Sequence, residues 1–403
     1  MVGFFAAHPS LRVPLVLAPV TAHYSWSKGL KLLGLGRDQL ELLPTAGMRL
    51  DPAALRDTLA RCARERLPVL MCVAVLGSTE YGTIDPIHEV LAARAESRGR
   101  GLDFAVHVDA AWGGYLATLF RHEDGSLRTR AEVAADYVQF PTPAVHAAFA
   151  ALGDTDSATV DPHKLGYLPY GTGAFICRDH RPMALLAERA DYVFHAATPA
   201  GYLARYRSLG QFIPEGSKSG AAAAAVYVTH KVLPLDHRHF GQLPRATVCA
   251  AEAFHARARR FALELADCVH ALVPFAPDSN LVCLALNPRG NRSITAANAF
   301  VRELHDTLRC DPQQPLQTKE FFGSVTTLRP DMLGHAQTTR IFQALGLDAS
   351  SLDPDEDRLM ILRHTLMNPY LIDHENGISY IDRYFEWLGR RIRATCATAS
   401  HTS

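Results

Sequence analysis

Leu67-Pro-Val-Leu-Met-Cys-Val-Ala-Val75 is a continuous apolar run with the character of a buried strand, and a second run, Phe104-Ala-Val-His-Val108, follows it. A helical segment at about 85–98 separates the two runs. Another helix, at about 51–66, precedes the first run and begins with an N-cap aspartate and a proline at the first helical position. Apolar strands that alternate with helices indicate a parallel sheet covered on both faces. The sequence therefore predicts an α/β protein.

The chain after Gly220 has a different character. The alanine-rich segment 220–231 predicts a tightly packed helix, and a long helix at about 241–265 leads out of the first domain. Shorter elements follow: strands at Asn280–Leu286, Ser324–Leu328 and Leu359–Thr365, and helices at 294–309 and 377–395. We therefore expect a large domain over residues 1–245 and a smaller C-terminal α/β domain over residues 246–403.

The composition limits the classes of function. The chain has 403 residues, 48% apolar and 20% charged, which is enough for two domains and a large core. Its 41 basic and 41 acidic residues give a formal net charge of zero, so we expect no nucleic-acid partner. No stretch approaches the roughly 20 apolar residues that span a bilayer. Residues 13–20 contain two prolines and predict a first buried strand in preference to a signal peptide.

Cysteines and histidines indicate neither disulfides nor a metal site. The eight cysteines contain no Cys-x-x-Cys pair and fall mostly within apolar runs, so we expect reduced core thiols in a cytoplasmic protein. His230, His237 and His239 lack an acid or a cysteine at ligand spacing, and no metal is predicted.

Polar residues follow three of the predicted strands, at Gly77-Ser-Thr79, Asp109 and His163-Lys164. In an open parallel sheet, ligands bind at the carboxyl ends of the strands. Asp109 comes after apolar residues, where a carboxylate is costly unless it meets a cation. Lys164 ends the run Ser157-Ala-Thr-Val-Asp-Pro-His-Lys and precedes a glycine-bounded loop. Taken alone, Asp109 is equally well a helix N-cap, and Lys164 a surface lysine.

Together, the amine and the carboxylate suit a pyridine aldehyde cofactor. Such a cofactor needs an amine to form a Schiff base and an anion to keep its ring nitrogen protonated as an electron sink. Ala111 and the two glycines after Trp112 would let a flat ring lie close to the backbone. His163 could reach a phosphate. His23 is by itself best explained as a buried, hydrogen-bonded histidine, but in such a site it could stack over the ring and relay protons.

Longer motifs surround these residues: His23-Tyr-Ser-Trp, Gly77-Ser-Thr-Glu, Asp109-Ala-Ala-Trp-Gly-Gly, Ser157-Ala-Thr-Val-Asp-Pro-His-Lys-Leu-Gly-Tyr-Leu-Pro-Tyr, Tyr192-Val-Phe, Glu215-Gly-Ser-Lys-Ser-Gly, His230-Lys-Val-Leu-Pro-Leu and Leu362-Arg-His-Thr-Leu-Met-Asn-Pro-Tyr. The chain resembles, from about residue 14 to 390, the group II pyridoxal-phosphate-dependent amino-acid decarboxylases, most of all bacterial tyrosine decarboxylases. The resemblance implies a large domain of the aspartate-aminotransferase-like fold (fold type I, PLP-dependent transferase-like). It also implies pyridoxal 5'-phosphate as cofactor, a small-molecule amino acid as substrate and a homodimer as working unit.

The resemblance also implies roles for single residues at the cofactor. Lys164 would be the Schiff-base lysine and Asp109 the partner of the pyridine nitrogen, with His23 and Ala111 on opposite faces of the ring. Three further residues would hold the cofactor: Thr79 near its phenolic oxygen, His163 at its phosphate, and Ser217 at the phosphate of the neighbouring subunit.

At the substrate, the resemblance implies that Tyr192 lies on a loop that closes over the site and protonates the carbanion. Tyr170 and Thr365 would line the pocket near the aromatic ring. Thr365 has a hydroxyl where tyrosine decarboxylases carry serine, which favours tyrosine and leaves phenylalanine, dopa and tryptophan open. We therefore expect decarboxylation of an aromatic L-amino acid.

The sequence departs from the family upstream of His23. The family has a Gly-Gly-Thr/Ser-type segment there, whose backbone amides hold the cofactor phosphate at a helix N-terminus. His23 is only 22 residues from the start of this sequence. We therefore expect either an N-terminally truncated or reduced member, or a phosphate held by fewer groups. Two alternatives follow: a degenerate pyridoxal-binding scaffold with little turnover, and another carbon–carbon lyase of the same fold.

Overall fold

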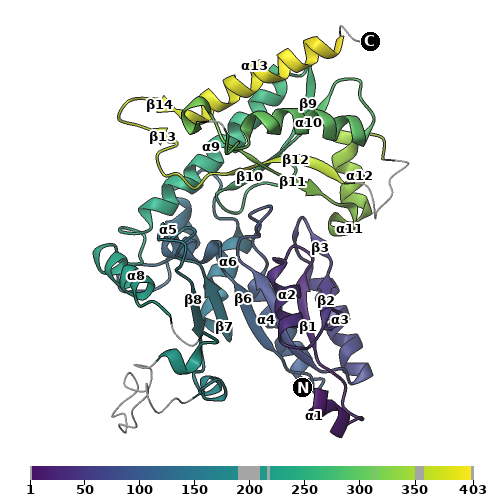
Figure 1. The fold of residues 1–403 in the computed structure, drawn as a ribbon, viewed down its shortest axis with the longest axis vertical. Helices are drawn as coiled ribbons and strands as arrows, with labels where there is room; N and C mark the ends of the chain where they lie inside the picture. Colours follow the sequence, from purple (N-terminus) through teal and green to yellow (C-terminus); the bar gives the residue numbers. More distant parts are fainter. Residues whose placement is uncertain (1, 189–208, 216–217, 314, 350–357, 401–403) are drawn as a thin grey trace.

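The computed structural model describes residues 2–188, 209–215, 218–313, 315–349 and 358–400. Figure 1 shows two units stacked along the long axis of the molecule, each built on its own sheet, with the long helix α9 running from the lower unit into the upper one. The helices and strands outside the two main sheets and their covering helices are short. They are α1 (Val2–Ala7), η1 (Arg37–Gln39), β3 (Thr45–Ala46), β4 (Arg49–Leu50), η2 (Gly113–Phe120), α5 (Arg130–Ala134), η3 (Ala151–Asp154), η4 (Arg181–Leu185), η5 (Leu209–Phe212), η6 (Leu316–Thr318), α11 (Pro330–Leu333), β13 (Ile372–Asp373) and β14 (Ile378–Ser379).

The lower unit contains a six-stranded sheet in the order β2-β1-β5-β6-β7-β8. Its strands are β1 (Leu15–Pro19), β2 (Leu40–Leu43), β5 (Val69–Val75), β6 (Ala105–Asp109), β7 (Ser157–Val160) and β8 (Ala174–Cys177). The first five strands of that order pair in parallel, and β8 joins β7 antiparallel at the edge. The mainly parallel sheet expected from the apolar runs is therefore confirmed.

The two faces of this sheet are covered unequally, because successive side chains of a strand point to opposite faces. One face, with Leu17, Ala74 and Val106, belongs to a large core that includes residues of α3 (Pro52–Glu65), α4 (Ile87–Arg98) and α6 (Pro143–Ala150). The other face carries a small cluster under α2 (Ser25–Leu32): Val16, Ala18, Leu30 and Val73. The sparse cover on this second face leaves room for a cavity at the strand ends.

The upper unit contains a four-stranded sheet in the order β11-β12-β10-β9, antiparallel throughout. Its elements are α9 (Gln242–Glu264), β9 (Val269–Leu272), β10 (Leu281–Pro288), α10 (Ile294–Leu308), β11 (Ser324–Leu328), α12 (His335–Ala344), β12 (Leu359–Thr365) and α13 (Tyr380–Ser400). Phe254 and Phe261 of α9 pack with Phe385 of α13 in its core. A boundary near residue 245, which assigns nearly all of α9 to this unit, remains our proposal.

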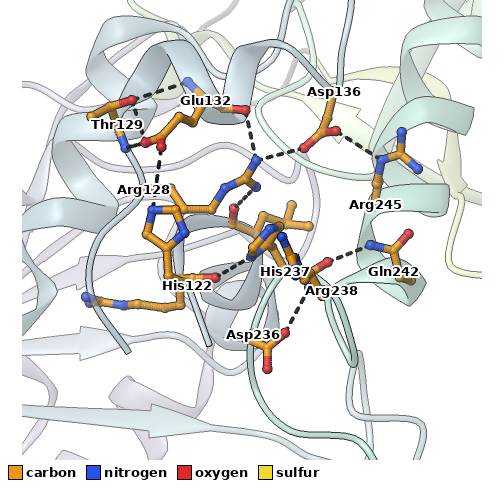
Figure 2. Close-up of polar contacts among 12 residues, drawn as sticks. His122, Arg128, Thr129, Glu132, Asp136, Asp236, His237, Arg238, Gln242 and Arg245 are labelled. Atoms are coloured by element: carbon orange, nitrogen blue, oxygen red, sulfur yellow. Dashed lines mark hydrogen bonds and ion pairs between the residues drawn. The ribbon is translucent and has the colours of Figure 1, made fainter. Parts of the chain in front are cut away.

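Polar contacts hold the start of α9 against the lower unit (Figure 2). Arg128 is buried and donates to Asp136 Oδ2 over 3.0 Å, and Asp136 Oδ1 lies 3.7 Å from Nε of Arg245 in α9. Gln242, at the first turn of α9, donates to the carbonyl oxygen of His237 over 2.6 Å. Since α9 continues into the core of the upper unit, these contacts help to fix the two units relative to each other.

The loop between β5 and α4 is the second connection between the units. Asp278 of the upper unit is buried and accepts hydrogen bonds from Arg49 Nε (2.6 Å) and from the backbone N–H of Ile84 (3.0 Å). Tyr81 donates to the carbonyl oxygen of Thr327 over 2.6 Å. Gly82 has a φ of +67°, and a Cβ there would lie 2.5 Å from Ser279 Oγ, so the close approach requires glycine. The loop that carries Thr79 is thus held by both units.

The structure corrects three details of the sequence-based expectations. The segment before α4 does not begin the helix at residue 85, because the buried carboxylate of Asp85 accepts the backbone N–H groups of Leu50 and Val75, each at 2.7 Å. Burial raises the pKa of Asp85 to about 7.

The helix α8 (Ala221–Val232) is not tightly packed, since none of its residues is buried. Of the eight free cysteines, three are buried and Cys310 is exposed, so the thiols are only partly core residues. In the part of the chain that the structure describes, no helix is long and apolar enough to cross a membrane.

Candidate active site

A cavity of about 680 Å³ lies at the carboxyl ends of the neighbouring parallel strands β1, β5, β6 and β7. Five residues predicted from the sequence line it: His23, Thr79, Asp109, Ala111 and Lys164. They come together because each one follows or ends a strand, and parallel strands end at the same edge of a sheet. Three residues that the sequence analysis did not single out, Trp26, Asp161 and Arg363, also line the cavity.

Lys164 lies in a tight turn after β7. Its Nζ is 2.9 Å from Oδ2 of Asp161, and its backbone N–H donates to the carbonyl oxygen of Asp161 over 3.0 Å. Gly166 is needed in this turn, because a Cβ there would lie 2.5 Å from the carbonyl oxygen of Pro162. The side chain of Lys164 is about one third exposed, so the ammonium is held at the cavity wall and still has access to the cavity.

Asp109 is the last residue of β6. Its Oδ1 accepts the backbone N–H of Ala111 at 3.3 Å, and its Oδ2 accepts the indole N–H of Trp26 at 3.0 Å. The following helix η2 has Trp112 at its N-cap position and no side-chain capping bond. The N-cap alternative for Asp109 is therefore not what the structure shows.

His107, two residues before Asp109, belongs to the same face of the sheet. Its Nδ1 lies 2.8 Å from Ser157 Oγ, and its Nε2 lies 3.2 Å from Thr159 Oγ1. Burial lowers the pKa of His107, although the Asp109 carboxylate opposes this shift. A neutral His107 therefore leaves the carboxylate of Asp109 free to pair with a cation from the cavity.

The glycines after Trp112 have a different role from the one expected. A Cβ on Gly113 would lie 2.2 Å from the carbonyl oxygen of Leu76, and one on Gly114 would lie 2.7 Å from the Val160 side chain. These glycines allow the chain after β6 to pack against its neighbours in the protein. Ala111 alone of this group lines the cavity.

Two further cavity residues connect the site to its surroundings. His23 follows β1, and its Nδ1 lies 2.8 Å from Ser25 Oγ. Arg363 comes from β12 of the upper unit and donates through Nε to the carbonyl oxygen of Thr79 over 2.9 Å. Burial lowers the pKa of the Arg363 guanidinium, which nevertheless stays charged because its ordinary pKa is so high. The sequence signal for Arg363 was a charged residue within an otherwise mostly apolar strand.

The other predicted residues lie outside this cavity. His163 places Nδ1 2.7 Å from the carbonyl oxygen of Thr172, and its ring lies 4.5 Å from that of Tyr170, which is 87% exposed. Thr365 lines a neighbouring cavity of about 360 Å³, to which Arg363 also contributes. The hydroxyl of Thr365 is buried and has no hydrogen-bond partner among the residues described. Tyr192 and Ser217 lie outside the described residues.

The residues that line the cavity fit the pyridine aldehyde part of pyridoxal phosphate. An amine, a carboxylate with acceptor capacity left on both oxygens, and an imidazole surround a space of about 680 Å³. Lys164 would hold the aldehyde carbon, Asp109 the ring nitrogen and His23 the ring face.

Comparison with known proteins supports the cofactor class. Residues 11–202 match the model of the pyridoxal-dependent decarboxylase conserved domain, and residues 251–392 match that of the tyrosine decarboxylase C-terminal region. An L-tyrosine decarboxylase of Enterococcus faecium is 31% identical over 93% of this chain and 61% of its own length. A probable L-aspartate decarboxylase of Haloarcula marismortui is 30% identical over 56% of this chain and 50% of its own length.

The fold is also similar to that of a solved structure. The crystal structure of Oryza sativa TDC with PLP and tryptamine superposes with a TM-score of 0.62 at 16% identity, covering 98% of this chain and 66% of the other. This likeness shows the fold, which is the fold type I expected from the sequence. The chain spans about three fifths of the length of the tyrosine decarboxylase that it matches. The two family models cover both units and confirm the expected family and cofactor class: the chain belongs to the pyridoxal-dependent decarboxylases and is similar to the bacterial tyrosine decarboxylases.

Proposed function

We propose that this chain is a pyridoxal-phosphate-dependent carboxy-lyase that decarboxylates an aromatic L-amino acid, with tyrosine as the favoured substrate, and that it acts as a cytoplasmic homodimer. The observation that carries the proposal is the convergence of Lys164, Asp109 and Arg363 on one cavity. An amine, a carboxylate and a second cation are the groups that a cofactor aldehyde, a pyridinium and a substrate carboxylate each require.

The cofactor, when bound, supplies an electron sink for the electron pair left behind when carbon dioxide departs. Asp109 would pair with the ring nitrogen and so keep this sink available. Asp161, at 2.9 Å from Nζ, holds the ammonium of Lys164 whenever the lysine is not attached. His23 would pack against the ring. Tyr192, which lies outside the described residues, would deliver a proton to the α-carbon.

Arg363 is suited to bind the carboxylate of an incoming amino acid. A guanidinium has five N–H donors, and the bonds to Thr79 and Ser324 use one donor of each nitrogen. The remaining donors are available for a carboxylate oxygen. Because Arg363 also borders the second cavity, a substrate held there by its carboxylate can place its side chain in either space.

The second cavity favours an aromatic side chain. Phe254, Phe321 and Tyr384 line it, and the unpaired hydroxyl of Thr365 is the polar group available to a phenol. A buried hydroxyl without a partner is costly, so a ligand that pairs with it gains more than one that does not. This supports tyrosine over phenylalanine. Tyr170 lines neither cavity and is 87% exposed, so its expected place near the aromatic ring stays a prediction.

The homodimer is supported by an uncovered apolar helix. In α8, Tyr227, Val228 and Val232 are 64%, 59% and 71% exposed. Figure 1 places α8 at the left edge of the lower unit, where a second copy could cover it. Burial of such side chains is a driving force for association. Ser217, four residues before the first residue of α8 in the sequence and outside the described residues, would reach the partner's cofactor phosphate in this proposal. Sedimentation of the protein and of Tyr227→Asp tests this: we expect a dimer that the substitution weakens, and a monomer at micromolar concentration would contradict it.

The substrate is tested by measuring carbon dioxide release from tyrosine, dopa, phenylalanine, tryptophan, glutamate and aspartate with saturating cofactor. We expect the highest rate with tyrosine. A best rate with aspartate or glutamate would contradict the assignment of the aromatic cavity. Cofactor binding without release from any of these amino acids would favour the degenerate scaffold, and aldehyde formation from a hydroxylated substrate would favour another carbon–carbon lyase.

A further inference from the structure

Trp26 is the side-chain donor to the carboxylate expected to hold the cofactor. Its indole Nε1–H donates to Oδ2 of Asp109 over 3.0 Å, between residues 83 positions apart in the chain. The indole ring also lies edge-on to His107, with 5.2 Å between ring centroids and a 63° angle between planes. Trp26 lines the same cavity as Lys164. The contact therefore joins helix α2 to the end of β6 beneath the space for the ring.

The geometry lets this hydrogen bond orient Asp109. An N–H group that donates to a carboxylate makes a charge-assisted bond, which is stronger than one between neutral groups. At 3.0 Å it fixes the rotation of the carboxylate plane, which the longer 3.3 Å bond from the Ala111 backbone restrains less. Each oxygen keeps a second acceptor position for a pyridinium N–H. His107 cannot replace Trp26, because both of its ring nitrogens lie within hydrogen-bond distance of hydroxyl groups of β7.

We propose that Trp26 is a positioning residue for the cofactor: its indole N–H holds the Asp109 carboxylate oriented toward the ring nitrogen. The same bond places the first turn of α2, and with it the adjacent His23, against the sheet. The proposal rests on the cofactor binding of the proposed function, but not on decarboxylation or on the identity of the substrate.

The test is a double-mutant cycle on cofactor affinity. Trp26→Phe keeps the ring and its contact with His107 and removes only the donor. The dissociation constant of pyridoxal phosphate is measured by visible circular dichroism for the wild type, W26F, D109N and the double variant. We expect W26F to weaken binding about ten-fold in the wild-type background, as for a lost charge-assisted hydrogen bond. In the D109N background, W26F should have little further effect on the dissociation constant, because the carboxylate that accepted the indole N–H is no longer there.

A matched control uses the other tryptophan in the cavity lining. Trp112 donates to Asn280 Oδ1 over 2.9 Å and not to Asp109, so the effect of W112F should be the same in both backgrounds. An unchanged dissociation constant for W26F, or equal effects of W26F with and without the Asp109 carboxylate, would overturn the proposal.

A second measurement needs no tryptophan variant. The protein has three tryptophans, so the apoprotein gives three indole N–H cross-peaks in a ¹⁵N-correlated NMR spectrum. D109N should move the cross-peak of Trp26, while that of Trp387, in the core of the upper unit, stays in place. If none moves, the hydrogen bond is absent in solution and the proposal is wrong. A protein that releases no carbon dioxide but shows the coupling of Trp26 to Asp109 would refute the proposed function and leave this inference intact.

Discussion

Replacing Arg363 by methionine keeps much of the length of the side chain and removes its charge and its N–H donors. In the structure Arg363 donates to the carbonyl oxygen of Thr79 and to Ser324 Oγ, and it is the cation that the upper unit adds to the cavity. Truncating one partner of a desolvated, hydrogen-bonded charge pair costs about 2–5 kcal/mol. Because Arg363 is only partly buried, we take the lower end of that range, about 2–3 kcal/mol. This corresponds to a fall in kcat/KM of roughly 30- to 150-fold.

The assay is carbon dioxide release at several tyrosine concentrations, together with thermal unfolding of each variant. Ser324→Ala is the matched control, since it removes one hydrogen-bond partner of Arg363 at 3.2 Å and leaves the charge in place. We expect S324A to stay within a few-fold of the wild type. A kcat/KM for Arg363→Met within three-fold of the wild type would refute the carboxylate-binding role. A loss explained by unfolding would appear as a lowered melting temperature.

Three further predictions concern the upper unit and its connection to the lower one. Thr365→Val replaces a buried, unpaired hydroxyl by a methyl group, so the free energy of unfolding should not fall. The preference for tyrosine over phenylalanine should drop about ten-fold, because the group that pairs with a phenol is gone. Calorimetry measures the first effect and competition assays the second, and a clear loss of stability would contradict the prediction. Burial lowers the pKa of His364 to about 4. The unfolded chain therefore binds a proton at this histidine more tightly than the folded protein does. About 3 kcal/mol of stability that is present above pH 6.5 should be lost as the pH falls to 4. Urea unfolding of His364→Asn should show a weaker dependence over this window, and an identical profile would count against it. Asp278→Asn removes the charge that pairs with Arg49 at 2.6 Å. The loss of this charge-assisted hydrogen bond should cost about 2 kcal/mol, measured as a lower urea midpoint. An unchanged midpoint would show that the pair contributes nothing.

Local sequence patterns were sufficient for the sheet of the lower unit and for half of the site. Asp109 and Lys164 could be placed at one edge because each terminates or follows an apolar run, and parallel strands share that edge. Trp26 and Arg363 could not be assigned, since their contacts to Asp109 and Thr79 span 83 and 284 positions in the chain. No periodicity encodes such pairs.

Other predictions were wrong because the role of a residue was inferred from its amino-acid type alone. Alanine-rich α8 suggested close packing, but its exposed face depends on what covers it, which one chain does not reveal. Gly113 suggested room for a ligand, but the atom that a Cβ would meet is the Leu76 carbonyl oxygen of its own chain. Asp85 suggested a helix start, but its carboxylate binds backbone N–H groups of two distant segments.

The central claim is that Lys164 is the amine that carries the cofactor, opposite the Asp109 carboxylate. Its most direct test is borohydride reduction of the purified protein after saturation with pyridoxal phosphate, followed by peptide mass spectrometry. The account predicts one pyridoxyl phosphate group per chain on the peptide that contains Lys164, and none in Lys164→Ala. Labelling of another lysine, or no labelling at saturating cofactor, would contradict it.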